Sequence, residues 1–92
     1  MKKLFRVVAK TPEVTVPNKD GGQTSKYILV LQETGGKYEP SYVATVFNYE
    51  PRCHLETGDL VYAILRFQAH EYNGQWYQDT VVKELIPINT NN

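Results

Sequence analysis

The sequence predicts a single all-β domain built as a small barrel, and three observations support this prediction. The chain has 92 residues, which is room for one hydrophobic core. Hydrophobic residues make up 41% and charged residues 22%, proportions typical of a folded globular protein. Short apolar or alternating segments, separated by glycine and proline turns, follow one another along the chain, a pattern that indicates strands.

Five segments are expected to form strands: residues 4–9, 27–32, 42–47, 61–72 and 75–85. Residues 11–25 contain two prolines and the run Asn-Lys-Asp-Gly-Gly, so we expect a loop or flexible hairpin there. Residues 48–58 leave room for a connector or one short helical turn. Five strands in a domain of this size favour a five-stranded Greek-key barrel, the OB-fold, with an SH3-like barrel as the alternative. We expect residues 1–88 to form this domain and the polar residues 89–92 to be disordered.

The fourth expected strand has the clearest alternation. One set of alternate positions is apolar throughout, and the other set is mostly polar. This period of two predicts a long strand with one face in the core. The side chains expected to be buried are Val61, Ala63, Leu65 and Phe67.

The turn after this strand fixes a hairpin. Asn73-Gly74 provides the positive φ values that a two-residue type I′ turn requires. Directly opposed residues share a face, so the register places Arg66, Gln68, His70, Tyr72, Tyr77 and Asp79 on one exposed face of the hairpin. Trp76 falls on the other face, close to the tip.

The charge is balanced overall but uneven along the chain. Ten bases match ten acids, yet residues 1–37 carry seven bases and three acids, a net charge of +4. A basic surface is expected if folding gathers this half on one side. The single Cys53 excludes an internal disulfide and fits a reducing compartment. No apolar run resembles a signal peptide or reaches the length of a membrane span, so we expect a cytoplasmic protein.

Four stretches resemble the bacterial single-stranded DNA-binding protein family and occur in the family's order: residues 11–22, 42–47, 58–62 and 72–77. They correspond to its first loop, third strand, start of the fourth strand and final hairpin. The last stretch also resembles a group of small uncharacterised bacterial proteins. Departures are a missing tryptophan at the start of the third strand, a short segment around Pro51 and no acidic tail for recruiting replication partners. The size is nearer to primosomal or phage-type members.

The resemblance implies an OB-fold that binds single-stranded DNA in replication, as a homodimer or homotetramer, with RNA as an open possibility. Such binding stacks bases on aromatic rings while cations contact phosphates. By the family match, Phe47 corresponds to a base-stacking phenylalanine and Tyr72 to an aromatic residue that ends strand four. The full set of candidates is Phe47, Tyr72, Tyr77 and Trp76 for stacking, and Arg66, Lys10, Lys19 and Lys26 for phosphates. Packing or a subunit interface would equally explain these aromatics, and Arg66 has Asp79 as an alternative partner.

The other tyrosines are expected in the core or an interface: Tyr27, Tyr38, Tyr42, Tyr49 and Tyr62. Tyr62 lies on the outward side of the fourth strand beside Ile64, and an exposed pair of this kind indicates a partner surface. We therefore assign Tyr62 and Ile64 to an oligomer interface.

Catalysis finds little support in the sequence. Cys53 and His54 are adjacent, and neighbouring residues rarely point at each other; one cysteine and two histidines do not supply a zinc site. No phosphate-binding glycine motif is present. We expect no enzyme, metal or cofactor. Two function classes remain: a single-stranded DNA-binding protein, favoured by the loop and hairpin motifs, and an OB-fold protein–protein interaction module, favoured by the zero net charge and the missing tryptophan.

Overall fold

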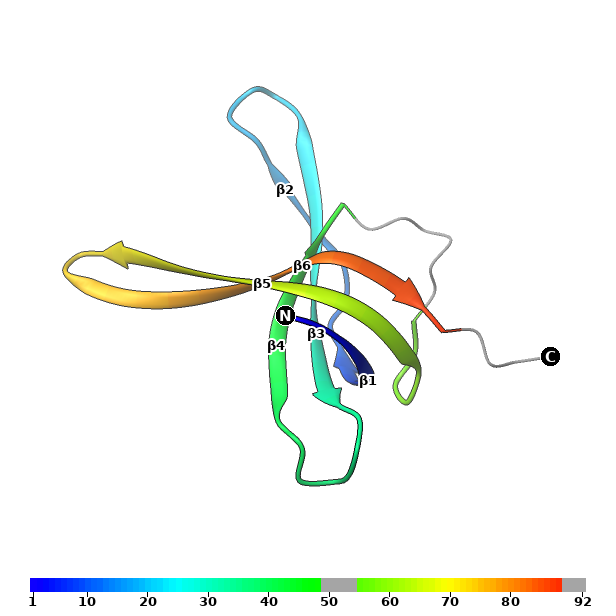
Figure 1. The fold of residues 1–92 in the computed structure, drawn as a ribbon. Coiled ribbons are helices and arrows are strands. Elements are labelled where there is room, and N and C mark those ends of the chain that lie inside the picture. The colour runs from blue at the N-terminus through cyan, green and yellow to red at the C-terminus, as the bar shows by residue number, and fades with distance from the viewer. Residues whose placement is uncertain (49–54, 89–92) are drawn as a thin grey trace.

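The computed structural model describes residues 1–48 and 55–88. It contains six strands (Figure 1): β1 (Lys2–Lys10), β2 (Val14–Pro17), β3 (Gln23–Glu33), β4 (Ser41–Phe47), β5 (Leu60–Tyr72) and β6 (Gln75–Pro87). The five expected strands are present. The additional strand, β2, forms a hairpin with the start of β3 inside the segment expected to be a loop or flexible hairpin. The predictions for Tyr49, Cys53 and His54, and for the tail 89–92, lie outside the described residues.

Five of the strands close into a ring. β1 pairs with β5, β5 with β6, β6 with β4, β4 with β3, and β3 again with β1. All these pairs are antiparallel except β4 with β6, which run parallel and meet at the single pair Thr45 and Val81. β2 lies outside the ring, on the free edge of β3. The connections between strands that are not neighbours in sequence make this a Greek-key barrel.

The core fills the inside of the ring. Alternate side chains on each strand point inward, as the period of two requires. The buried apolar residues are Phe5, Val7, Tyr27, Leu29, Leu31, Ala44, Val46, Leu55, Val61, Ala63 and Leu65. The burial expected for Val61, Ala63 and Leu65 is thereby confirmed.

The burial expected for Phe67 is wrong, because the barrel ends before this residue. β1 pairs with β5 as far as Ile64, so past Leu65 the strands β5 and β6 continue as a pair of their own. Figure 1 shows this two-stranded ribbon, residues 66–80, projecting from the barrel. Phe67 lies at its base, 37% exposed, with the centroid of its ring 6.0 Å from that of the Tyr42 ring.

The hairpin register is confirmed. Tyr72 pairs with Gln75, His70 with Tyr77, and Gln68 with Asp79. The turn residues Asn73 and Gly74 have φ angles of 51° and 79°, as a type I′ turn requires. The dipeptide therefore set which side chains share a face of the ribbon.

A polar network closes the end of the barrel beside Phe67. Lys3 Nζ donates to Glu33 Oε1 at 2.8 Å, and the Tyr42 hydroxyl donates to Glu33 Oε2 at 2.6 Å. The Tyr42 ring also packs edge-on against the Phe5 ring, with the two ring centroids 6.0 Å apart. The hydrogen bonds from Lys3 and Tyr42 lower the pKa of Glu33, and the hydrogen bond to Glu33 raises the pKa of Tyr42.

Replacing Glu33 with glutamine is expected to destabilise the fold in a pH-dependent way. Because the pKa of Glu33 is lower in the folded chain, the unfolded chain binds more protons as the pH falls. The carboxylate thus stabilises the fold above its usual pKa, and this stabilisation disappears as the pH falls through the lowered value. Urea unfolding should show a larger wild-type advantage at pH 7 than at pH 3. An equal advantage at both pH values would contradict this, and Glu13→Gln, at an exposed position, is the control.

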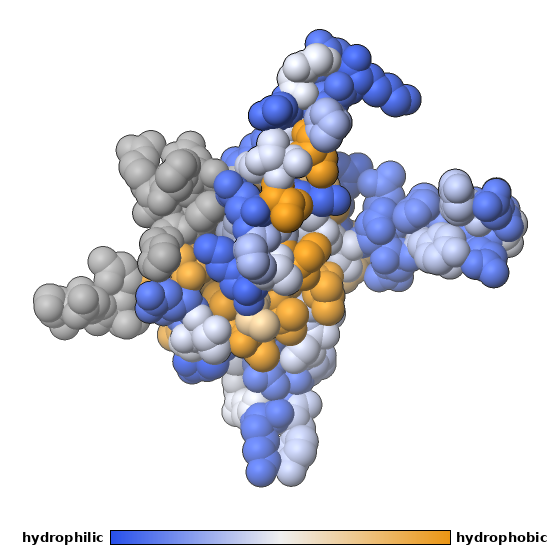
Figure 2. Space-filling model, turned by 180° about the vertical axis from the view of Figure 1, so that it is seen from behind, coloured by the Kyte–Doolittle hydropathy of each residue, from blue (hydrophilic) through white to orange (hydrophobic). Residues whose placement is uncertain are grey.

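Hydropathy follows the division between the barrel and its projections. In Figure 2, apolar residues gather over the body of the molecule, whereas the projecting hairpins carry mostly hydrophilic or intermediate residues. Residues 1–48 and 55–88 include no helix that is long and apolar enough to cross a membrane.

Candidate nucleic-acid interface

One side of the barrel presents outward-facing residues from four adjacent strands. Their pairing forms a continuous row that runs from β5 through β6 and β4 to β3: Arg66, Val81, Thr45 and Ile28. Paired residues point to the same side of a sheet, and their strand neighbours point into the core. We call this side the outer face. It continues toward the β2–β3 hairpin in one direction and onto the ribbon in the other.

Phe47 and Lys26 lie on the outer face at the end near the β2–β3 hairpin. Phe47 is 45% exposed, because Val46 before it takes the inward position on β4. It is directly opposite Lys26 on β3, and Lys26 is also opposite Val14 on β2. An exposed ring and a lysine are therefore cross-strand neighbours, which is the combination of groups that binds single-stranded nucleic acid.

The ribbon carries a second group of rings on the same face. Tyr72 is 65% exposed, and the Tyr77 ring stacks on that of His70 with centroids 5.6 Å apart. His70 Nδ1 lies 3.0 Å from Asp79 Oδ2, so the side chain that contacts the Asp79 carboxylate across the ribbon is His70 and not Arg66. The sequence predicts that His70 lies on this face, but His70 is not among the predicted binding residues. Its position opposite Tyr77 in the hairpin register is the sequence feature that indicates it.

Trp76 is separated from these rings. It is 71% exposed and opposite Glu71, so its side chain lies on the other face of the ribbon. The aromatics proposed for stacking thus do not form one surface.

Phe47 and Tyr77 lie at different ends of the outer face. From the pair Thr45–Val81, Phe47 is two residues along β4 in one direction and Tyr77 is four residues along β6 in the other. At 3.3 Å per residue, the two rings are about 20 Å apart along the strands. They cannot stack on the same base.

The three candidate lysines have different positions. Lys26 lies on the outer face beside Phe47. Lys19 is exposed in the turn at the tip of the β2–β3 hairpin. Lys10 pairs with the inward-facing Leu29, and its ammonium lies 5.0 Å from the centre of the Tyr27 ring, at the end of the barrel. The basic first half of the chain is therefore spread over several surfaces.

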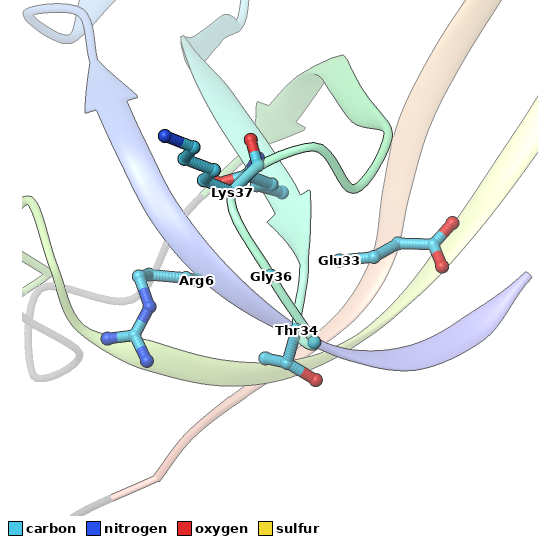
Figure 3. A pocket seen from close by; sticks show the side chains of 7 residues that line it. Arg6, Glu33, Thr34, Gly36 and Lys37 are labelled. Carbon is cyan, nitrogen blue, oxygen red and sulfur yellow. The ribbon is translucent and has the colours of Figure 1, made fainter.

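A pocket of about 430 Å³ lies away from these aromatics (Figure 3). It is lined by Arg6, Gln32, Glu33, Thr34, Gly35, Gly36 and Lys37. In Figure 3 the Glu33 side chain points away from Arg6 and Lys37. Gln32 is six residues from Lys26 on β3, about 20 Å along the strand, so this pocket is separate from the position of Phe47 and Lys26.

The remaining expectations concern tyrosines and metals. Tyr27 is buried, Tyr42 and Tyr62 are half-buried, and Ile64 is half-buried beside Tyr62. Tyr38 is 88% exposed, in the loop between β3 and β4, so it is not a core residue, and its alternative assignment to an interface stays a prediction. Within residues 1–48 and 55–88, no group of three or more histidine, cysteine, aspartate or glutamate side chains could hold a metal ion.

Comparison with known proteins identifies the fold. No protein-family model and no curated protein sequence matches the chain. Among solved structures, the chain is similar to the second OB-fold domain of replication protein A from Methanococcus maripaludis, determined by NMR in solution. The TM-score is 0.71 with 21% sequence identity, over 99% of this chain and 85% of that domain. The chain has an OB-fold. The SH3-like alternative is excluded, and membership of the bacterial single-stranded DNA-binding protein family stays a prediction.

Proposed function

We propose that the chain binds single-stranded DNA on the outer face of its OB-fold. The observation that carries this proposal is the alignment of Phe47, next to Lys26, with the rings of the ribbon on one side of the barrel. An OB-fold binds oligonucleotides over its second and third strands, between the loops after the first and fourth strands. Here those elements are β3 and β4, the β2–β3 hairpin and the ribbon.

The strand would contact the protein at two stacking positions joined by cations. One base stacks on Phe47 with its phosphate near Lys26, and others stack on Tyr72 and Tyr77. Arg66, at the base of the ribbon, lies between the two positions, and Lys19 extends the path along the β2–β3 hairpin. The separation of about 20 Å requires a strand of several nucleotides, within the 4–16 that one OB-fold covers.

The fold similarity supports the same class of ligand. The similar solved structure is a domain of a protein named replication protein A. The proposed role is binding without catalysis: the outer face offers rings and cations, and stacking requires no bond to be broken.

A salt-dependent titration tests the proposal. Fluorescence anisotropy of labelled oligo(dT) should show binding that weakens with salt, since each neutralised phosphate on a single strand contributes a slope of about −0.7 in log K against log salt. Contacts from Lys26, Arg66 and Lys19 predict a slope of about −2. Oligo(U) under the same conditions measures the preference for DNA over RNA. No measurable binding to oligo(dT) at low salt would overturn the proposal.

Replacing Lys26 with alanine should change the salt dependence in particular. One fewer phosphate contact is expected to reduce the magnitude of the slope by about 0.7. The matched control is Lys37→Ala, because Lys37 lies 5.2 Å from the Tyr38 ring in the loop between β3 and β4, away from the outer face. A slope that Lys26→Ala leaves unchanged would remove Lys26 from the DNA contacts.

The second candidate is a protein–protein interaction module, and the zero net charge favours it because nucleic-acid affinity depends largely on positive charge. The same titration separates the two candidates. Absence of oligo(dT) binding at low salt would leave the interaction module as the function.

A further inference from the structure

A second surface, on β1, β5 and β6, has outward side chains in register across three strands. Leu4 pairs with Tyr62, and Tyr62 pairs with Ile86, so one row is entirely apolar. In the next row, Ile64 lies between Lys2 and Glu84. We call these six residues the β1–β5–β6 patch.

The patch is accessible, and it adjoins the outer face on β5, where Arg66 follows Ile64 by two residues on the same side of the strand. Ile86 is 53% exposed, Leu4 is exposed, and Tyr62 and Ile64 are half-buried. The Lys2 ammonium lies 5.8 Å from the centre of the Tyr62 ring, so it stays over the patch. The stacking position at Phe47 and Lys26 belongs to β3 and β4, which form another part of the ring.

We propose that a second copy of this chain packs face to face on the β1–β5–β6 patch, related by a two-fold axis that runs along β5. A two-fold interface uses the same patch on both copies. This axis places Tyr62 against Tyr62 of the second copy and exchanges β1 with β6. Leu4 then covers Ile86 of the second copy, and aligned sheets pack in this way at about 10 Å.

The charged residues of the patch favour an axis along β5 over an axis across the strands, and they favour a second copy of the chain as the partner. With the axis along β5, Lys2 of each copy lies over Glu84 of the other, which gives two opposite-charge pairs. These outweigh the one like-charge pair of this arrangement, Arg66 over Arg66 of the second copy, beyond the patch on β5. An axis across the strands would instead place Lys2 over Arg6 of the second copy, because Arg6 is four residues along β1 from Lys2 and also faces outward, and these charges repel. The zero net charge adds no general repulsion between copies.

The oligomeric state provides the first test, independent of DNA binding. Sedimentation velocity should report a dimer for the wild type at micromolar concentration. Ile86→Asp, which adds a charge at an exposed position of the apolar row, should give a monomer with unchanged circular dichroism. Val43→Asp is the matched control, because Val43 is an exposed β-branched residue on β4, 64% exposed, outside the patch. A wild-type monomer at high micromolar concentration, or a dimer that survives Ile86→Asp, would overturn the proposal.

Charge exchange tests the orientation of the two copies. Lys2→Glu alone and Glu84→Lys alone each turn two attractive pairs into repulsive ones, so each should weaken dimerisation about tenfold or more. The double variant restores opposite charges and should recover most of the wild-type affinity. Double-variant dimerisation that is as weak as the two single effects combined would exclude the axis along β5.

Discussion

Replacing Phe5 with alanine is expected to lower the free energy of unfolding by about 3–5 kcal/mol, the range for removal of a large aromatic side chain from a core. Phe5 is fully buried on β1, where this strand pairs with both β3 and β5. Its ring also supports Tyr42, whose hydroxyl donates to Glu33. The substitution therefore leaves a cavity and loosens the end of the barrel.

Chemical denaturation followed by circular dichroism measures this change. A loss of this size consumes much of the stability of a 92-residue domain, so part of the variant is expected to be unfolded even without denaturant. Tyr38→Ala is the control, because this tyrosine is exposed in the loop between β3 and β4 and its removal should cost less than about 0.5 kcal/mol. A loss below 1 kcal/mol for Phe5→Ala would show that the site collapses around the cavity or that the core is not continuous there.

The strands and the hairpin register were predictable because their signals are local. Alternation of apolar and polar residues marks a strand with one buried face, and Asn73-Gly74 specifies both the turn and the pairing that follows from it. Both signals require only neighbours in the sequence. For the same reason, the outward position of Tyr72 and the separation of Trp76 from it were predictable without any resemblance.

The length of the barrel was not predictable, because it depends on partners far away in the chain. The alternation in β5 continues through Phe67, but burial stops after Leu65, where the pairing with β1 has ended. A periodic pattern reports which face is apolar and does not report where a third strand stops covering it. The exposure of Phe67 has this cause.

The candidate site was predictable only in part for a similar reason. The importance of Phe47 came from a family resemblance, and its pairing with Lys26 depends on the register between β3 and β4. Lys10 was placed with the phosphate contacts because of its charge, yet its strand position directs it over Tyr27. Charge along a sequence does not determine the surface on which a side chain lies.

Replacing both Phe47 and Tyr77 with alanine is expected to remove most of the affinity for oligo(dT). Each base–aromatic stack contributes about 1–3 kcal/mol, and the two rings lie about 20 Å apart along the strands. Sites at such a separation add within about 0.5 kcal/mol, so the double variant should lose the sum of the two single effects. The salt slope should remain near its wild-type value, since neither ring neutralises a phosphate.

Trp76→Ala is the discriminating control for this pair of substitutions. It removes an equally large exposed aromatic from the same hairpin, but from the face opposite to Tyr77. DNA that follows the outer face leaves Trp76 free, so its removal should change the affinity less than twofold. A large loss with Trp76→Ala and none with Tyr77→Ala would mean that the strand passes on the other side of the ribbon. If the two single losses do not add, the proposed path is contradicted. Rings that lie about 20 Å apart along the strands contact different nucleotides and should contribute independently.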